Sequence, residues 1–337
     1  MLNKIELKNF GPLTNIHWTN LGQINLVIGD NGSGKTFLMK ALYSAMRTIE
    51  EYKRGNDQRT TAEILVEKLY WTFQTDKIGD LVTKGADSSL SCSVEFDGRL
   101  FYYSFGKDTT KKISSQENHV LPRISNSIFL PAKEVLSLHQ IILKSREQDK
   151  IFGFDDTYLD LARALRQAPT GGKSLAEFGK SCQSLEDILG GKVEYDEASG
   201  RWQFKKGNQK FPIGVTAEGI KKIAILDTLL GNRYIDSHSI IFIDEPESAL
   251  HPAAISQILD IISVLSARGI QFFLASHSYF VVKKLFLIAQ EKGTSIPVIS
   301  AQNSRWQCAD LREGMVSNPI IDESIRLYKE EVGLVLK

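Results

Sequence analysis

The stretch Gly29-Asp30-Asn31-Gly32-Ser33-Gly34-Lys35-Thr36 decides the fold of this chain. It matches the pattern GxxxxGK[ST], whose glycines let backbone N–H groups point at phosphate oxygens without obstruction by a Cβ. The apolar run 24–28 precedes the stretch, and residues 36–50 carry apolar side chains at helical spacing. A strand, a glycine loop and a helix in this order predict a phosphate-binding loop. A tight turn before an ordinary helix is the alternative, and the number of matched positions disfavours it.

This loop predicts a site for ATP and Mg²⁺. We expect Lys35 to pair with the β- and γ-phosphates, and Thr36 to ligate Mg²⁺ through its hydroxyl. The helix N-terminus adds the positive end of its dipole. The predicted nucleotide-binding residues are Asn31, Gly32, Ser33, Gly34, Lys35 and Thr36.

A second motif lies much further along the chain, at residues 240–252. The apolar run 240–243 ends in Asp244 and Glu245, and a strand in an α/β sheet places such carboxylates at the edge where ligands bind. Asp244 is expected to hold Mg²⁺, and Glu245 to act as general base on the attacking water. An apolar run that ends in two acids is weak evidence alone, because a solvated strand end has the same sequence. Its pairing with the glycine loop favours the functional interpretation.

A histidine follows the next apolar run. Ala275-Ser276-His277-Ser278 comes directly after residues 271–274, so His277 is expected to sense or position the γ-phosphate. The alternative is an ordinary surface histidine. The predicted catalytic residues are therefore Glu245, His277 and Lys35.

Composition narrows the class of protein. The chain has 337 residues, of which 42% are hydrophobic and 24% charged, and these fractions are typical of a globular protein. The net charge of +1 gives no bulk attraction to DNA. Cys92, Cys182 and Cys308 form no CxxC pair, which argues against a zinc site or a disulfide framework. We expect a cytoplasmic protein with no membrane partner, because the chain has no apolar run of membrane-spanning length and no signal-peptide core.

Apolar runs and turn signals predict the order of elements. Residues 61–84 and 319–332 resemble helices, Asp97-Gly98 predicts a hairpin between 90–96 and 99–105, and 108–118 resembles a polar loop. Helices broken at Gly153, Pro169 and Gly171-Gly172 are expected over 133–190, followed by an antiparallel piece over 191–212. Further strands are expected at 4–8, 127–130, 239–243, 271–275 and 297–301, and further helices at 253–267 and 279–290.

These elements predict an α/β fold. It is a P-loop NTPase with a mixed β-sheet core, an antiparallel β-subdomain and an inserted helical lobe. The nucleotide-binding core with its β-subdomain is expected to comprise residues 1–131 and 213–337. The lobe, with a short β-hairpin, is expected to comprise residues 132–212.

The order of motifs resembles that of ABC-type ATPase heads. Thr216-Ala217-Glu218-Gly219 precedes an apolar helix, Asp244-Glu245-Pro246-Glu247 leads to Leu250-His251-Pro252, and Ser276-His277-Ser278 follows. Within these heads the chain resembles the branch of RecF-type proteins, structural-maintenance-of-chromosomes heads and OLD (overcoming lysogenization defect) ATPases. Asn9-Phe10-Gly11 near the start is also typical of that branch. Without this resemblance, Thr216 to Gly219 would be interpreted as an ordinary helix start.

The resemblance implies a homodimer or higher homo-oligomer that buries ATP between its heads. Ala217, Glu218 and Gly219 of one subunit would contact the γ-phosphate held by the other. The D-loop, formed by Ser248, Ala249, Leu250 and His251, would cross the interface. Hydrolysis of ATP would loosen the assembly, which makes ATP a conformational switch.

Two positions depart from the family pattern. Thr-Ala-Glu-Gly replaces the transporter sequence Leu-Ser-Gly-Gly, and a carboxylate at Glu218 is unfavourable near a triphosphate unless the side chain points away. A glutamine is expected after the strand that ends in Pro131, where this chain has Ala132-Lys133-Glu134, and Gln140 lies too far along the chain to fill that place. Whether Lys133 or Glu134 replaces the glutamine stays open.

The resemblance also suggests a role. No acidic cluster resembling the TOPRIM nuclease of OLD proteins follows His277, and no long coiled coil is evident, so nuclease or toxin activity would belong to a separate effector protein. We therefore expect an ATPase that serves as the sensor or regulator of a bacterial anti-phage defence or toxin–antitoxin-like system. The alternative is a RecF-like DNA repair ATPase that binds DNA when loaded with ATP. A transporter ATPase is a second alternative, which Leu250-His251 and the large insertion disfavour. A third is a non-enzymatic scaffold that binds ATP without hydrolysing it.

Overall fold

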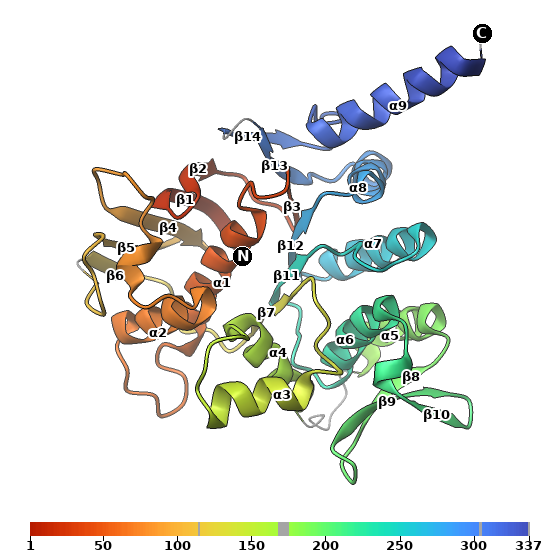
Figure 1. The fold of residues 1–337 in the computed structure, drawn as a ribbon, viewed down its shortest axis with the longest axis horizontal. Coiled ribbons are helices and arrows are strands. Elements are labelled where there is room, and N and C mark those ends of the chain that lie inside the picture. Colours follow the sequence, from red (N-terminus) through yellow and green to blue (C-terminus); the bar gives the residue numbers. More distant parts are fainter. Residues whose placement is uncertain (114, 168–174, 303–304, 336–337) are drawn as a thin grey trace.

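The computed structural model describes residues 1–113, 115–167, 175–302 and 305–335. Three sheets and the helices around them form the fold shown in Figure 1. The strands are β1 (Leu2–Phe10), β2 (Leu13–Trp18), β3 (Ile24–Gly29), β4 (Leu90–Phe96), β5 (Arg99–Phe105), β6 (Ser115–Asn118), β7 (Ser127–Leu130), β8 (Lys192–Asp196), β9 (Arg201–Lys206), β10 (Gln209–Pro212), β11 (Ile240–Asp244), β12 (Gln271–Ser276), β13 (Pro297–Gln302) and β14 (Arg305–Asp310). The α-helices are α1 (Lys35–Glu51), α2 (Thr61–Phe73), α3 (His139–Leu143), α4 (Asp156–Leu165), α5 (Leu175–Leu189), α6 (Glu218–Gly231), α7 (Pro252–Ser266), α8 (Tyr279–Lys292) and α9 (Pro319–Val335).

The central sheet has the strand order β14-β13-β3-β12-β11-β7. Its strands pair in parallel except at β13 and β14, which are antiparallel. β3, β7, β11 and β12 are buried along their whole length, which explains why their sequences are continuous apolar runs rather than alternating patterns. The predicted mixed sheet is therefore confirmed.

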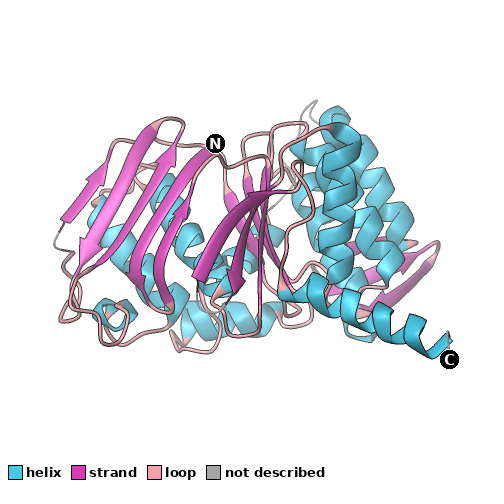
Figure 2. Ribbon diagram, turned by 90° about the horizontal axis from the view of Figure 1, so that it is seen from above, coloured by secondary structure: helices cyan, strands magenta, loops and turns pink. Residues whose placement is uncertain are grey.

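Alternation along these strands builds two hydrophobic cores, one on each face of the central sheet. Ile241 and Ile243 belong to the core that contains α6, α7 and α8, whereas Phe242 belongs to the core that contains α1. Phe242 stacks between Phe129 and Phe273, with ring centroids 6.3 and 5.2 Å away. Figure 2 shows the central strands between these helical layers.

The second sheet is antiparallel, in the order β2-β1-β4-β5-β6, and shares a core with α1 and α2. The hairpin at Asp97-Gly98 lies where the sequence predicts it. The predicted loop over 108–118 is wrong for residues 115–118, because they pair with the edge of β5 as β6. The free edge of β5 offers backbone N–H and C=O groups that pair with residues 115–118, although the side chains of this segment are polar.

Helices between β7 and β8 complete the core that contains α6. α4 packs on β7, and α5 packs on α6 and α7, with Phe178 and Leu185 buried in the shared cluster. A π-helix, Lys144–Gln148, continues α3. β8, β9 and β10 form the third sheet. The predicted breaks at Pro169 and Gly171-Gly172 lie outside the described residues.

One predicted helix ends early. The helix expected over 61–84 stops at Phe73, because Gln74 adopts a left-handed conformation with φ 50°. A short 3-10 helix, Ile78–Leu81, follows. In the described part of the chain, no helix has the length and apolar character needed to span a membrane.

Candidate nucleotide-binding and hydrolysis site

The glycine loop joins the C-terminal end of β3 to the start of α1. Gly29 and Gly34 have φ values of 152° and 96°, which side chains rarely adopt. A Cβ at Gly29 would lie 2.8 Å from the Cβ of Ala301, and one at Gly34 would lie 3.0 Å from Leu13 Cδ2. Both positions therefore require glycine for conformation and for space.

Lys35 folds back over the loop that precedes it. Its Nζ donates hydrogen bonds to the carbonyl oxygens of Gly29 and Asp30, at 2.7 and 2.9 Å. Burial lowers the pKa of this ammonium, although the carboxylates of Asp244 and Glu245 act in the opposite direction. The Lys35 ammonium is thus held beside the loop by two neutral carbonyl groups, and an anion such as a phosphate is able to replace them.

The two predicted Mg²⁺ ligands are in direct contact. Thr36 Oγ1 donates a hydrogen bond of 2.8 Å to Asp244 Oδ2. Asp244 ends β11, which pairs with β12, and β12 pairs with β3, so the sheet brings the two motifs together at one edge. Burial raises the pKa of Asp244, and the charge of Glu245 raises it further, while the bond from Thr36 lowers it.

Glu245 stands in a constrained backbone position directly after β11. Its φ is 50°, its N–H donates to Ala275 O at 2.9 Å, and its carbonyl accepts from Lys222 Nζ at 2.7 Å. The side chain is 37% exposed, and its Oε1 lies 3.6 Å from His277 Nδ1. The structure therefore places the predicted base and the predicted histidine next to each other. The roles of both residues stay predictions.

Glu247 is a residue of this site that the sequence interpretation did not single out. Its Oε1 accepts hydrogen bonds from Ser276 Oγ at 2.8 Å and from the backbone N–H of His277 at 3.1 Å, and its side chain is only 9% exposed. It therefore ties the end of β12 to the loop after β11. The position of Glu247 at the end of the Asp-Glu-Pro-Glu sequence was the signal from which it could have been found.

Lys222 is a second residue of this site that the sequence interpretation did not single out, and its neighbour Lys221 also contacts other side chains. Lys221 is buried and donates to Glu218 Oε1 at 2.8 Å and to Ser137 Oγ at 3.1 Å. Burial lowers the pKa of Lys222, while the nearby charges of Glu247 and Glu245 raise it. The sequence did contain a signal for this burial, because the two lysines directly precede the apolar run that starts at Ile223 on the same helix.

The residues predicted to act in trans lie against the D-loop of their own chain. A Cβ at Gly219 would come within 2.7 Å of Ala249 O and 2.6 Å of Leu250 Cδ2, so only glycine permits this close packing. Ala249 has a φ of 60°, and His251 Nδ1 accepts from Ala253 N, which caps α7. Residues 217–219 and 248–251 thus form one continuous surface, on which Ala217 and Glu218 are exposed.

The segment that replaces the expected glutamine shows one clear interaction. Glu134 Oε1 accepts a hydrogen bond of 2.5 Å from Ser137 N and lies 3.9 Å from Lys221 Nζ. This orients Glu134 toward the start of α6. Whether Lys133 or Glu134 contacts nucleotide stays open.

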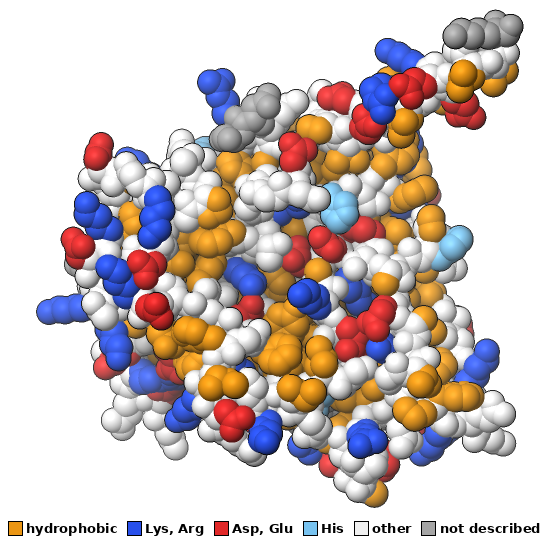
Figure 3. Space-filling model, viewed as in Figure 1, with side chains coloured by type: hydrophobic (Ala, Val, Ile, Leu, Met, Phe, Trp, Pro, Cys, Tyr) orange, Lys and Arg blue, Asp and Glu red, His pale blue; other side chains and the backbone are white. Residues whose placement is uncertain are grey.

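The helices around the site are joined by ion pairs. Lys40 on α1 binds Asp155 Oδ2 at 2.5 Å, and Asp155 also caps α4 through Thr157 N at 2.8 Å. At the other end of α1, Glu50 is fully buried and accepts from both the N–H and the Oγ of Ser127, at 2.9 and 2.6 Å. In the same view as Figure 1, acidic, basic and histidine side chains gather over the ends of the central strands (Figure 3).

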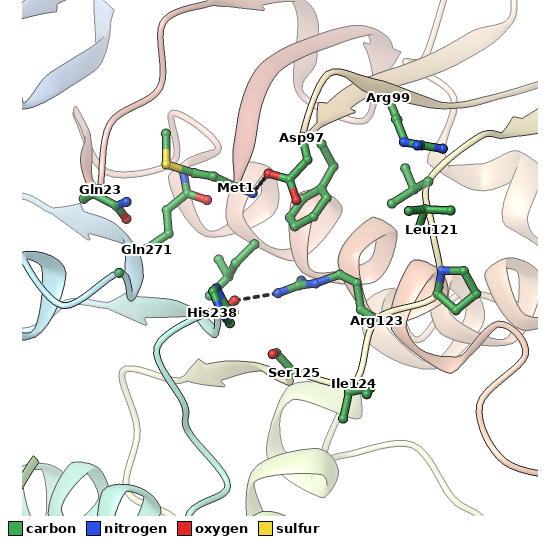
Figure 4. A pocket seen from close by; sticks show the side chains of 15 residues that line it. Met1, Gln23, Asp97, Arg99, Leu121, Arg123, Ile124, Ser125, His238 and Gln271 are labelled. Carbon is green, nitrogen blue, oxygen red and sulfur yellow. Dashed lines mark hydrogen bonds and ion pairs between the residues drawn. The ribbon is translucent and has the colours of Figure 1, made fainter. Parts of the chain in front are cut away.

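A pocket of about 610 Å³ lies at the opposite ends of these strands. Figure 4 shows two interactions among its lining residues: Arg123 donates to His238 O at 2.6 Å, and the amino group of Met1 pairs with Asp97. Arg123 also binds Glu50 Oε1 at 2.9 Å. Because ligands of α/β sheets bind at the carboxyl ends of the strands, we assign the nucleotide to the glycine-loop edge and not to this pocket.

The fold and this edge define a P-loop ATPase. Residues 24–283 match a family model described as "AAA domain, putative AbiEii toxin, Type IV TA system", so the chain belongs to this family, and it is an ATPase. A protein of Helicobacter pylori described as "ATP/GTP phosphatase" is 22% identical over 334 residues, covering 87% of this chain and 89% of that protein. An Smc head solved with the C-winged helix domain of ScpA is similar in fold, with a TM-score of 0.54 at 13% identity over 92% of this chain and 97% of that one.

The burial of Asp244 predicts how stability depends on pH. A carboxyl whose pKa is raised by folding contributes its stability below its ordinary pKa, about 4, and that stability is lost as pH rises through the folded-state value. In metal-free buffer at pH 7 to 8, Asp244→Asn is therefore expected to raise the free energy of unfolding by about 0.5–2 kcal/mol. The difference should shrink toward pH 4. Urea unfolding measures it, with Asp87→Asn at an exposed position as control. A variant no more stable than the wild type at pH 7 to 8 would contradict the assigned cause.

Proposed function

We propose that this ATPase holds ATP with Mg²⁺ at the glycine loop, hydrolyses it with Glu245 and changes its assembly state as it does so. The observation that carries the proposal is the 2.8 Å hydrogen bond between Thr36 and Asp244. It joins two motifs that lie far apart in sequence at the edge of the sheet where α/β proteins bind ligands.

The donor set at this contact fits Mg²⁺. A threonine hydroxyl and a carboxylate are oxygen ligands, and Mg²⁺ is usually bound by one or two protein oxygens together with substrate phosphates. Thr36 and Asp244 would hold the ion in place of their present hydrogen bond. When bound, Mg²⁺ neutralises charge on the phosphates.

Loop residues 31–36 would bind the phosphates of ATP. Gly32 and Gly34 leave the backbone N–H groups accessible, and the N-terminus of α1 adds a favourable dipole. Lys35 would exchange the carbonyls of Gly29 and Asp30 for phosphate oxygens, which bind an ammonium more strongly because they are charged.

Glu245 is proposed to take a proton from the attacking water. His277, 3.6 Å away, would orient the γ-phosphate or the water. Lys222 and Glu247 are proposed as positioning residues, because the first binds the Glu245 carbonyl and the second binds the His277 N–H. These two contacts fix the backbone of Glu245 and of His277, and they thereby help to position both side chains.

The surface formed by residues 217–219 and 248–251 is proposed to complete the ATP site of a second copy. Glu218 bonds Lys221 of its own chain, which offsets the negative charge that would be unfavourable beside a triphosphate. Membership of the OLD branch, noted from the motifs, belongs with this proposal.

Glu245→Gln tests the assignment of the base. Loss of a general base is expected to reduce phosphate release by about 10²–10⁴-fold, whereas binding of a fluorescent ATP analogue should be retained. Glu313→Gln, at an exposed position, serves as control. Equal phosphate release from the wild type and Glu245→Gln would exclude Glu245 as the base.

Mixing two defective variants tests the composite site. Lys35→Ala disables the loop, and Ala217→Arg places a bulky side chain on the surface offered to the partner. Each variant alone should hydrolyse little ATP. Their mixture should regain activity, because a mixed dimer holds one site with an intact loop and an intact surface. Val215→Arg is the control, since Val215 is 76% exposed and lies two residues away. A mixture no more active than its components would contradict a shared site.

We further propose that the chain is the sensor or regulator of a defence or toxin–antitoxin-like system with a separate effector. The family description, which names a type IV toxin–antitoxin system, supports this role. Cells that carry the chain with its neighbouring genes should resist phage, and Glu245→Gln should change that resistance at least tenfold in plating efficiency. Unchanged plating, together with ATP-dependent and salt-sensitive DNA binding, would favour the DNA-repair alternative instead.

A further inference from the structure

The C-terminal helix α9 projects away from the rest of the protein (Figures 1 and 2). It has 17 residues, a length of about 25 Å at 1.5 Å per residue. Its first turn packs near α8, and Ile321 is the buried residue of the helix. Beyond that turn, the described chain leaves the helix largely uncovered.

One side of α9 is apolar along its whole length. Ile321, Ile325, Tyr328, Val332 and Val335 recur at alternating intervals of four and three residues, the spacing of a coiled-coil seam. Ile325 and Tyr328 are 46% and 66% exposed. Leu327 and Leu334 are also exposed, at 51% and 74%, but they lie outside this stripe, on the side of the helix that carries Glu330. A helix with such a stripe is normally covered by another element.

Some charged side chains of α9 are paired within the helix, and others are not. Arg326 binds Glu323 at 2.6 Å and also pairs with Glu330, so these three charges are satisfied within the helix. Asp322 and Lys329 have no ion-pair partner among the residues that the structure describes. They are seven residues apart, lie on one flank of the apolar stripe and carry opposite charges.

We propose that α9 docks antiparallel on the α9 of a second copy of this chain. In this arrangement Ile325 of each copy packs against Tyr328 of the other, in the centre of the contact. The same register sets Asp322 of each copy beside Lys329 of the other. A two-fold axis makes the ion pair occur twice, as a self-complementary interface requires.

Charge decides the direction of the two helices. In a parallel pair, Lys329 would lie beside Ser324 of the other copy, and Asp322 and Lys329 would both stay unpaired. The antiparallel pair satisfies both. The contact uses neither the glycine loop nor the 217–219 surface, so it forms without ATP and differs from the proposed nucleotide-dependent interface. Because the helix is short, the association is expected to be weak and dependent on concentration.

Sedimentation velocity of the nucleotide-free full chain tests this proposal. The wild type should shift from one to two monomer masses as concentration rises at low salt. Tyr328→Glu should abolish the shift. Asp322→Lys and Lys329→Asp alone should each weaken association by about tenfold, since each turns two attractions into repulsions. The double variant Asp322→Lys/Lys329→Asp should restore it, whereas Glu330→Lys, on the opposite side of the helix, should leave it within about twofold.

Circular dichroism and the melting temperature would show that each variant is folded. A wild type that stays monomeric at all concentrations overturns the proposal, as does a dimer that Tyr328→Glu leaves intact. Failure of the double variant to restore a dimer weakened by both single changes overturns the antiparallel register. An ATPase rate that responds to Glu245→Gln in any of these cases leaves the proposed hydrolysis standing, so the two proposals fail separately.

Discussion

The hydrogen bond between Thr36 and Asp244 is the constraint on which the rest of the fold depends. It requires the strand before the glycine loop and the strand before the acids to end at the same edge, with one strand between them. β12, which fills that place, also delivers His277 to the site. The long stretch between the two motifs must therefore leave the central sheet after α1 and return to it. It returns first through β7 and again through β11. Before the first return it adds β4, β5 and β6 to the second sheet, and between the two returns it builds the helices around α4 and α5 and the third sheet.

Buried charges fix how these parts meet. Arg47 on α1 lies 3.3 Å from Asp160 on α4, and Lys68 on α2 lies 2.8 Å from Glu51. Lys68 and Arg47 are both buried, and the carboxylates around Lys68 raise its pKa although burial opposes this. Such pairs add little net stability, because removing the charges from water offsets most of their attraction. Removal of one partner is costly, however, so the network favours a single arrangement of α1, α2 and α4.

The sequence was most informative where burial and chemistry coincide. The central strands were located because strands buried on both faces are continuous apolar runs, and the glycine loop was located because its conformation requires glycine. β6, Ser-Gln-Glu-Asn, and β14, which begins with Arg305, were missed because edge strands keep polar side chains and are specified by their neighbours' backbone. Lys222 and Glu247 were missed for a different reason. Their partners lie on elements distant in sequence, so their contacts exist only after the sheet has formed.

The buried carboxylate of Glu50 has a consequence for motion. It holds the last turn of α1 to the first residue of β7, while the first turn of α1 is continuous with the glycine loop and Lys40 reaches α4. A rod clamped at both ends neither slides nor tilts without breaking buried bonds. The glycine loop is therefore held in place. If hydrolysis is coupled to movement as proposed, that movement falls to side chains such as Lys35 and to the exposed surface of residues 217–219.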